Sequence, residues 1–454
     1  MAIESVNPTT GKMIKSIDAF TNEKVEIIIN EMQNDFFKWK ETSFDERKKL
    51  MFNAANILRN EKDKYAEILT LEMGKPITQA IAEVEKCAWV CEYYAENAES
   101  ILQKEFIKTD ASESFVQFDP IGIVLAVMPW NFPFWQVFRF TAPALMAGNA
   151  GLLKHASNVP MSALAIEEIF HKAGFTKNIF RTLLINSNQV ETVIENPKIK
   201  AVTLTGSEYA GSMVASKSGK MLKKSVMELG GSDPFIVLKD ADLQSAVNTA
   251  VTARLLNNGQ SCISAKRFIV VEEIVDEFEK LFVEKMSKIV IGDPMDSKTE
   301  LGPIAREDLL FELHEQVIKS IKLGANLLIG GKRINMNGNF YSPTILSNVK
   351  KGMPAYEQEL FGPVASVIKV KNEQEAIFVA NDTEFGLGAS LWTSDIVKAK
   401  SLAKQIDSGS VFINGMVKSD PRLPFGGIKL SGYGRELSHY GIKEFVNIKT
   451  VWIK

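Results

Sequence analysis

Cysteine is scarce in this sequence, which has only three in 454 residues. So few thiols cannot form a disulfide framework, and their scarcity is typical of proteins from reducing compartments. We therefore predict a cytoplasmic location. Cys87 and Cys91 are spaced one helical turn apart, but no histidine or further cysteine completes a metal-ligand set with them. The sequence predicts core packing for this pair and no metal site.

Long apolar runs and an excess of one charge are missing too. The most apolar run, residues 121–130, covers about ten positions, whereas a membrane-spanning helix needs about twenty. The first residues, Met-Ala-Ile-Glu-Ser-Val-Asn-Pro, lack the basic and apolar regions of a secretory signal. The formal net charge of -2 offers no basic surface for nucleic acid. These absences predict a soluble protein that acts on a small molecule, without a membrane or nucleic-acid partner.

What the sequence does contain is an alternation of short apolar strands and helical stretches. Residues 20–105 have helical periodicity, and Ser43 and Glu46 have the spacing of a capping box. Strand and helix alternation downstream of residue 120 predicts an α/β fold with a parallel sheet covered on both faces. The predicted strands lie at 122–128, 151–153, 201–204, 235–238 and 268–271, and an amphipathic helix is predicted at 275–289.

A chain of this length exceeds the limit of about 250 to 300 residues for a single core, so we expect more than one domain. We predict that residues 1–105 and 121–230 form the first domain and that residues 231–430 form the second, with a boundary near Gly230 and Gly231. Residues 106–120 have the pattern of a protruding hairpin, and residues 440–454 that of an added edge strand.

Cys262 has the setting of a nucleophile. It follows a glycine-opened turn, Gly-Gln-Ser-Cys, between a helical pattern and an apolar strand. Such a turn can present a sulfur to a cleft while nearby backbone N–H groups stay free. The alternative is that Cys262 is a small hydrophobic core residue, as free cysteines often are.

Three other positions carry chemistry that would complement a nucleophile. Asn131, bracketed by two prolines at the end of a strand, is suited to donate to an oxyanion, although it could be an ordinary turn residue. Glu228 could act as a general base or be merely solvated. Gly206 and Ser207 end a strand before a helix, whose N-terminus suits a phosphate. The usual Gly-x-Gly-x-x-Gly dinucleotide motif is absent at this turn.

Six motifs in a fixed order resemble those of the aldehyde dehydrogenase superfamily, and the resemblance covers essentially the whole chain. They are Pro-Trp-Asn-Phe-Pro at 129–133, Thr-Gly-Ser at 205–207, Glu-Leu-Gly-Gly at 228–231, Gly-Gln-Ser-Cys at 259–262, Glu-Leu-Phe-Gly-Pro at 359–363 and Pro-Phe-Gly-Gly-Ile-Lys-Leu-Ser-Gly-Tyr-Gly-Arg-Glu at 424–436. The resemblance implies a Rossmann-type cofactor domain, an α/β catalytic domain and a small β element for oligomerisation. A homodimer or homotetramer is expected.

The resemblance also implies an activity, the NAD(P)-dependent oxidation of an aldehyde to an acid. Cys262 would attack the aldehyde, Asn131 would hold the oxyanion, and Glu228 would activate the water that hydrolyses a thioester. Lys154 and Glu359 would bind ribose hydroxyls of the cofactor. The other residues implied for the cofactor site are Trp130, Ser157, Asn158, Gly206, Ser207, Leu229 and Phe361.

The chain departs from most relatives next to Lys154, where it reads Lys-His-Ala-Ser-Asn. In NAD-preferring relatives a glutamate stands at the position of Asn158, and its charge repels the 2′-phosphate of NADP. Asn158 removes that charge, so we predict that NADP is accepted, alone or with NAD.

Arg139 is the best indication of the substrate. Many relatives that oxidise neutral aldehydes have an aromatic residue at this position, whereas succinate-semialdehyde dehydrogenases have an arginine that binds the substrate carboxylate. Ser419 and Arg422 fall where those enzymes add further carboxylate contacts, but Leu256 stands where some have a second arginine. The chain therefore looks most like the short bacterial succinate-semialdehyde dehydrogenases.

Two alternatives stay open at this level. Arg139 could lie on the surface or pair with an internal acid, in which case a neutral aldehyde or another semialdehyde, such as glutarate semialdehyde, would be the substrate. A catalytically silent protein on the same fold would be expected to lack Cys262 or Glu228, and both are present. Glu228 also favours hydrolysis of the thioester over its transfer to coenzyme A.

Overall fold

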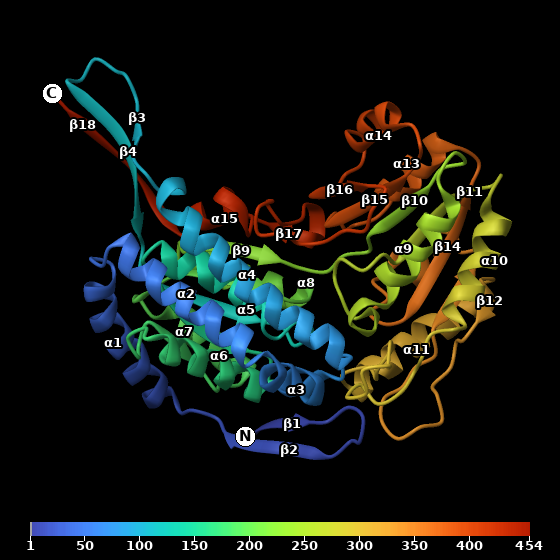
Figure 1. The fold of residues 1–454 in the computed structure, drawn as a ribbon, viewed down its shortest axis with the longest axis horizontal. Helices are drawn as coiled ribbons and strands as arrows, with labels where there is room; N and C mark the ends of the chain where they lie inside the picture. The colour runs from blue at the N-terminus through green and yellow to red at the C-terminus, as the bar shows by residue number, and fades with distance from the viewer. Residues whose placement is uncertain (1) are drawn as a thin grey trace.

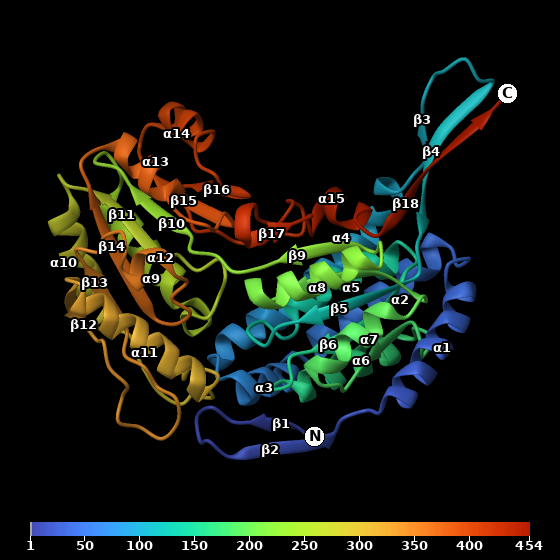
Figure 2. The ribbon, with the colours of Figure 1, turned by 180° about the vertical axis from the view of Figure 1, so that it is seen from behind.

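The computed structural model describes residues 2–454, which form two α/β lobes and a thin β arm (Figure 1). In Figure 1 the N-terminal half of the chain builds the lobe on the left, residues from about 231 to 430 build the lobe on the right, and the last residues return to the left lobe and the arm. The same arrangement is seen from behind in Figure 2, where the arm again projects away from both lobes. The α/β fold class predicted from the sequence is confirmed.

The N-terminal helices begin and end where local sequence signals place them. Ser43 and Glu46 form the predicted capping box, which satisfies two backbone N–H groups at the start of the second helix. Cys87 and Cys91 are both fully buried among apolar residues, so the prediction of core packing is confirmed. The helices are α1 (Asn22–Trp39), α2 (Phe44–Asn60), α3 (Lys62–Met73) and α4 (Ile77–Ile101).

The first lobe contains a six-stranded sheet in the order β17-β9-β8-β5-β6-β7. Five of its strands are parallel, and every residue of β6 is buried, as expected for a sheet covered on both faces. The strands are β5 (Ile123–Met128), β6 (Ala150–His155), β7 (Phe180–Thr182), β8 (Ile199–Thr205), β9 (Lys224–Glu228) and β17 (Gly432–Tyr433). The helices between and after them are α5 (Trp135–Met146), α6 (Pro160–Ala173), α7 (Val190–Glu195), α8 (Glu208–Lys220) and α15 (Ser438–Lys443).

The second lobe contains a seven-stranded sheet in the order β12-β13-β14-β11-β10-β15-β16. Its strands are β10 (Pro234–Val237), β11 (Arg267–Val271), β12 (Asn326–Ile329), β13 (Thr344–Ser347), β14 (Val364–Val370), β15 (Gly388–Trp392) and β16 (Ser410–Ile413). Its helices are α9 (Leu243–Leu255), α10 (Val275–Met286), α11 (Glu307–Lys322), α12 (Pro354–Glu357), α13 (Glu373–Asn381) and α14 (Ile396–Ala403). Two separate apolar clusters form on this sheet, and alternate residues of β10 and β11 belong to different clusters: Ile236 and Ile269 to one, Phe235 and Phe268 to the other.

The arm is a three-stranded antiparallel sheet that joins segments far apart in the sequence. Strand β4 (Glu113–Pro120) pairs with β3 (Glu105–Phe106) on one side and with β18 (Val446–Ile453) on the other (Figure 1). The prediction of a hairpin and an added C-terminal strand is confirmed, although the first strand of the hairpin has only two residues.

Several elements were not predicted. A hairpin of β1 (Ala2–Val6) and β2 (Met13–Asp18) lies below the first lobe in Figure 1. The strands between residues 326 and 413 are four to seven residues long, and glycines and prolines between them obscure their pattern. No helix within residues 2–454 is long and apolar enough to span a membrane.

Candidate active site

The turn before Cys262 is held in a rare backbone conformation. Helix α9 ends at Leu255, and Asn257, Asn258 and Gly259 then have positive φ angles of 57°, 58° and 74°. A Cβ atom on Gly259 would lie 2.4 Å from the backbone of Gly362, so only glycine fits there. Asparagine tolerates the left-handed region better than most residues, which explains the Asn-Asn-Gly sequence.

The side chain of Asn258 fixes this turn to two distant segments. Its amide donates to the carbonyls of Gly74 at 2.8 Å and Pro303 at 3.0 Å, and its oxygen accepts from the N–H of Gly302 at 2.8 Å. Both N–H groups of the amide and its oxygen bond to backbone groups inside the protein. The turn is therefore anchored to both lobes at once.

Lys266 holds the segment that carries the nucleophile from beneath. Its buried ammonium donates to the carbonyls of Ser261 and Cys262, both at 2.8 Å, and to that of Ser264 at 3.3 Å. The same ammonium pairs with Glu359 at 3.0 Å. One cation thus links the nucleophile's backbone to a carboxylate in the wall of the neighbouring cavity.

The thiol of Cys262 is protonated in the free protein at neutral pH. Burial raises the pKa of Cys262 to about 12, and the positive charges of Lys266 and Arg139 oppose this rise only in part. The residue is nevertheless partly exposed, and its sulfur faces a cavity. A thiolate must therefore form during reaction rather than exist beforehand.

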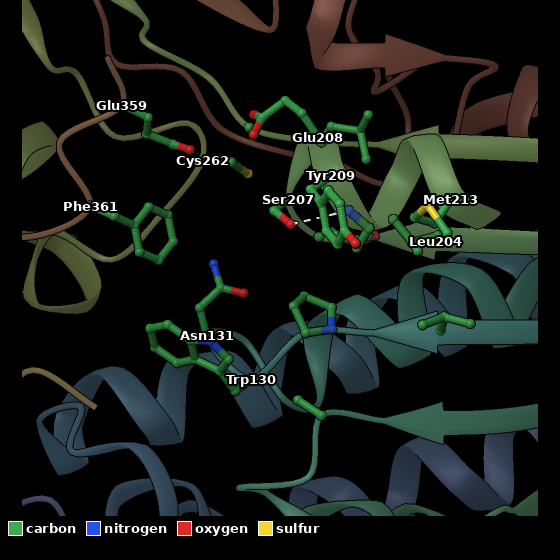
Figure 3. A pocket seen from close by; sticks show the side chains of 18 of the residues that line it. Trp130, Asn131, Leu204, Ser207, Glu208, Tyr209, Met213, Cys262, Glu359 and Phe361 are labelled. Carbon is green, nitrogen blue, oxygen red and sulfur yellow. Dashed lines mark hydrogen bonds between the residues drawn. The ribbon is translucent and has the colours of Figure 1, made fainter. Parts of the chain in front are cut away.

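Cys262 opens into a cavity of about 1170 Å³ between the two lobes. In Figure 3 its sulfur lies between Glu359 and the start of α8, and the ring of Phe361 lies across the cavity from that of Trp130. These two rings meet edge to face with centroids 5.8 Å apart. The predicted site residues that line this one cavity are Trp130, Asn131, Lys154, Gly206, Ser207, Leu229, Cys262, Glu359 and Phe361.

Asn131 is rigidly placed beside the nucleophile's turn. Its side-chain amide donates to the carbonyl of Gln260 at 3.1 Å, and its own carbonyl accepts from Asn257 at 2.8 Å. Figure 3 shows the amide group pointing from the Trp130 side of the cavity toward Cys262. The second N–H of this amide remains for an oxygen formed at a carbon bound to the sulfur.

The residues around the cavity fit a dinucleotide. Ser207 caps α8 by accepting from the N–H of Ala210, so the free N–H groups at the helix start face the cavity. Lys154 is buried and forms no ion pair with any carboxylate of residues 2–454, so a bound phosphate or ribose would provide the missing partner. Ser157 and Asn158 follow β6 but do not line the cavity itself, and the side-chain amide nitrogen of Asn158 is buried without a partner.

Glu228 does not face the cavity. It ends β9 next to Gly432 of β17, and a Cβ atom on Gly426 would lie 2.7 Å from its carboxylate. Both carboxylate oxygens are buried without a hydrogen bond to residues 2–454. Burial and repulsion from Glu436 raise the pKa of Glu228 well above its usual range. The side chain must turn toward Cys262 to act on a water there.

Arg139, predicted to bind the substrate carboxylate, is engaged with groups inside the protein. Its guanidinium is buried, pairs with Glu436 through Nε and donates from Nη2 to Thr205 at 3.3 Å. It also lies over the ring of Phe425, 4.6 Å from the centroid. The structure therefore shows the internal ion pair that the sequence left open as an alternative, although Nη1 makes no hydrogen bond to residues 2–454.

Ser419 and Arg422 lie apart from the cavity that contains Cys262. Arg422 is largely exposed and makes a two-pronged pair with Asp420 at 2.9 and 2.7 Å, so its guanidinium is already satisfied. Ser419 is buried, and its hydroxyl accepts from the ammonium of Lys86 at 2.8 Å. Arg422 is therefore paired with Asp420, two residues earlier, and its contact with a substrate stays a prediction.

Three residues of this region were missed in the sequence. Lys266 lies four residues after Cys262, and Glu436 is the last residue of the motif at 424–436. These positions could have marked both residues as part of the site. Lys86 lies on α4, far from every motif, and nothing in its local sequence marks it. Only the fold brings it to Ser419.

Comparison with known proteins agrees with this geometry. Residues 1–451 match the aldehyde dehydrogenase family. The chain is 52% identical, over 100% of both chains, to a Synechocystis protein named as a probable NADP+ succinate-semialdehyde dehydrogenase. It is 49% identical, again over 100% of both, to succinate-semialdehyde dehydrogenase (NADP+) 1 of Mycobacterium tuberculosis. The crystal structure of succinic semialdehyde dehydrogenase from Streptococcus pyogenes with NADP+ superposes with a TM-score of 0.98, at 40% identity and 100% coverage of each chain.

Proposed function

The chain belongs to the aldehyde dehydrogenase family, and from this premise we propose that it oxidises succinate semialdehyde to succinate with NADP+ as the electron acceptor. The observation that carries the proposal is the placement of Cys262 and Asn131 at one cavity of dinucleotide size. Relatives about half identical over their whole length carry the same substrate and cofactor in their names.

The first step forms a bond between the sulfur of Cys262 and the aldehyde carbon. The thiol transfers its proton to a water molecule, the sulfur attacks the carbonyl carbon, the carbonyl oxygen becomes an oxyanion, and the amide of Asn131 donates to that oxygen. Removing such a donor typically slows catalysis by about 100- to 1,000-fold. When bound, NADP+ would accept the hydride from the carbon attached to Cys262, and a thioester would remain on the sulfur.

The second step hydrolyses this thioester. Water attacks the carbonyl carbon, the carbon–sulfur bond breaks, and the acid leaves while the sulfur regains a proton. We assign the removal of the water's proton to Glu228 after its side chain turns from Gly426 toward Cys262. The raised pKa of Glu228 makes its carboxylate a stronger base once it is ionised.

We assign the cofactor to the cavity wall of the first lobe. Lys154 would bind a ribose hydroxyl or the 2′-phosphate, with Ser157 and Asn158 beside it, and Glu359 would bind the second ribose. Gly206, Ser207 and Leu229 would contact the rest of the dinucleotide, with Trp130 and Phe361 enclosing its reactive end. Asn158 carries no charge that would repel a 2′-phosphate, which supports NADP+ and leaves NAD+ as a second acceptor.

A panel of aldehydes tests this function. We expect kcat/KM to be highest for succinate semialdehyde, followed by glutarate semialdehyde, and much lower for butanal, with NADP+ preferred to NAD+. Replacing Cys262 with alanine should abolish turnover without changing Tm. Equal turnover of butanal and succinate semialdehyde would contradict the proposal.

The buried ion pair of Arg139 with Glu436 favours one alternative function, the oxidation of a neutral aldehyde. If that pair persists during catalysis, the acid-specific arginine is absent, and a neutral aldehyde becomes the better substrate. Running the same panel of aldehydes on Arg139→Leu separates the two substrate classes. For a neutral-aldehyde enzyme, this variant would affect turnover of butanal and of succinate semialdehyde equally.

The organisation of the molecule completes the proposal. We propose that residues 1–105 and 121–230 bind the cofactor, that residues 231–430 carry the nucleophile, and that residues 106–120 and 440–454 join subunits of a homodimer or homotetramer. The arm supports this because Phe106, Ile448 and Trp452 expose large apolar side chains on it.

We also propose a cytoplasmic location, which the three free thiols support.

A further inference from the structure

Lys266 contacts both the backbone of the nucleophile and the wall of the cavity. Its ammonium donates to the carbonyls of Ser261 and Cys262, both at 2.8 Å, and to that of Ser264 at 3.3 Å. It also lies 3.0 Å from the carboxylate of Glu359. An ammonium has three protons, so these four acceptors compete for them. One group therefore holds the Cys262 segment and Glu359 at the same time.

The ion pair lies between the protein interior and the cavity. The side chain of Lys266 is 1% exposed, whereas that of Glu359 is 19% exposed and lines the cavity that contains Cys262. Among residues 2–454, Glu359 is the one carboxylate that pairs with this ammonium. A buried ammonium without a carboxylate is costly, so the pair fixes the positions of both side chains.

Gly231 packs against the same groups from the segment that joins the two lobes. Its N–H donates to Glu359 at 3.3 Å, and a Cβ atom on it would lie 2.7 Å from the carbonyl oxygen of Cys262. That oxygen is thus confined between Gly231 and the ammonium of Lys266. A change at Lys266 therefore acts on the Cys262 backbone and on Glu359 together.

The charge of Lys266 also reaches the sulfur. The sulfur and the carbonyl belong to one residue, so covalent geometry keeps the ammonium within about 8 Å of the sulfur. Buried charges are screened much less by salt than exposed ones. Burial raises the pKa of Cys262, Lys266 is the largest influence that lowers it, Glu359 raises it again, and Arg139 and Asp233 have smaller, opposite effects. Lys266 and Glu359 thus act on the thiol in opposite directions.

We propose that Lys266 is a positioning residue that favours the thiolate of Cys262 and orients Glu359 toward a bound cofactor. Lys266 does not line the cavity, so it acts through the carbonyl of Cys262 and the carboxylate of Glu359. The inference rests on the proposed function, which supplies the roles of Cys262 and Glu359.

Alkylation of Cys262 in the free enzyme tests the first part. At pH 9 we expect iodoacetamide to modify Cys262 at least about tenfold more slowly in Lys266→Met than in wild type, because the thiolate loses a stabilising charge. Lys266→Arg keeps the charge and should stay within about threefold of wild type. Glu359→Gln removes the opposing charge and should speed the reaction by at least about threefold. Lys351→Met, at an exposed lysine that pairs with Asp382, is the matched control.

A merely structural role of Lys266 predicts a change of the opposite sign. Loss of the ammonium leaves three carbonyls without their donor, and a loosened segment would expose the sulfur and speed alkylation. Faster or unchanged alkylation in Lys266→Met would therefore overturn the inference. If Lys266→Met does not fold, Glu359→Gln provides the test, and unchanged or slower alkylation in that variant would overturn the inference as well.

Binding of NADPH tests the second part without turnover. Lys266→Met should raise the Kd for NADPH in a fluorescence titration by at least about threefold, because Glu359 is no longer held in place. In the Glu359→Gln background the same substitution should change the Kd little, since Lys266 acts on the cofactor only through Glu359. Equal losses in both backgrounds, or no loss in either, would overturn this part.

The outcomes separate this inference from the proposed function. The alkylation assay contains neither aldehyde nor cofactor. If wild type oxidises no aldehyde, the proposed function fails whatever the alkylation rates are. If wild type oxidises succinate semialdehyde but the alkylation rates of Lys266→Met and Glu359→Gln do not move in opposite directions, only the role of Lys266 fails.

Discussion

At the scale of single residues, the reactive groups are in states opposite to those they need during reaction. The thiol of Cys262 is protonated, and the pKa of Glu228 is raised well above its usual range. Burial is the main cause in both cases, and it would also strengthen electrostatic interactions with a bound substrate. The free protein is thus built around neutral groups that must ionise or turn as the reaction proceeds.

The thiol's state can be measured by alkylation. We expect iodoacetamide to modify Cys262 slowly at pH 7, and the rate should rise steadily with pH through pH 10, because the pKa of Cys262 is about 12. Mass spectrometry of the Cys262 peptide measures this rate, and Cys262→Ala gives the background. A plateau below pH 9 would show that the thiol ionises more easily than its burial indicates.

The repulsion between two buried acids predicts a shift in the pH profile. Glu436 raises the pKa of Glu228, and Glu228 acts as a base only when it is ionised, so activity should rise with pH. Glu436→Gln removes the repulsion and leaves the charge of Arg139 uncompensated, and both changes lower the pKa of Glu228. The rising limb of kcat against pH should therefore move to lower pH. A shift to higher pH would contradict the assignment of Glu228 as the base.

Cofactor choice is expected to depend on a single charge. Asn158→Glu places a carboxylate beside Lys154 and should lower kcat/KM for NADP+ by at least about tenfold, the effect of roughly 1.4 kcal/mol. The kcat/KM for NAD+ should stay the same or rise. Asn158→Gln is the matched control, because it adds the same length without charge. Equal losses with both cofactors would mean that Asn158 does not approach the 2′-phosphate.

At the scale of elements, the position of the turn between α9 and β11 could be predicted from the sequence, but its backbone conformation could not. Gly259 and the change of periodicity show that a turn precedes Cys262. The left-handed Asn257 and Asn258 could not be predicted, because their conformation depends on contacts with Gly74 and Pro303, far away in the sequence.

The strands show the same division. Strands β5, β6 and β8 of the first sheet could be predicted because they contain continuous apolar runs, whereas β7, β9 and β17 were not predicted. Strands β12 to β16 could not, because glycines and prolines interrupt this part of the sequence and pairing with distant neighbours defines the strands. Long-range pairing also explains the engagement of Arg139, because Glu436 lies far from it in the sequence and meets it only in the folded protein. The pair of Arg422 with Asp420 is local, two residues apart, and nothing in the sequence favours it over a contact with the substrate.

The glycine of the turn can be tested by adding one methyl group. Gly259→Ala introduces a Cβ atom 2.4 Å from the backbone of Gly362 at a φ of +74°, so we expect a loss of more than about 2 kcal/mol of unfolding free energy. Gly219→Ala, in α8 with nothing within 4 Å of the added atom, should instead stabilise by about 0.4 to 1 kcal/mol. Urea unfolding measures both, and equal stability of the two variants would contradict the packing described.

At the scale of the whole molecule, the candidate site depends on both lobes. The first lobe supplies Asn131, Lys154 and the start of α8, and the second supplies Cys262 and Glu359. Asn258 connects the lobes at the nucleophile through hydrogen bonds to the backbone of Gly74 and Pro303, and Lys266 links the nucleophile's backbone to Glu359 within the second lobe. The division into lobes could be predicted from chain length, whereas these connections could not.

The arm makes a prediction about assembly. Ile448→Lys with Trp452→Glu places charges on exposed apolar positions of β18 without removing the strand. We expect a smaller oligomer than wild type in light scattering coupled to size-exclusion chromatography, because apolar contact between subunits is lost. Tyr209→Lys, an exposed aromatic residue away from the arm, is the control. An unchanged mass would assign subunit contacts to another surface.

The hydrogen bonds that fix the Asn258 side chain also affect the chemical stability of the protein during storage. Asparagine followed by glycine is the pair most prone to spontaneous deamidation, because the glycine N–H can attack the side-chain amide when the chain is mobile. Here that amide is enclosed and bound by three backbone groups, so the reaction geometry is out of reach while the fold is intact. A deamidated Asn258 would place a carboxylate against the carbonyls of Gly74 and Pro303. Slow chemical decay of this protein in storage should therefore begin in molecules that have transiently opened at this turn.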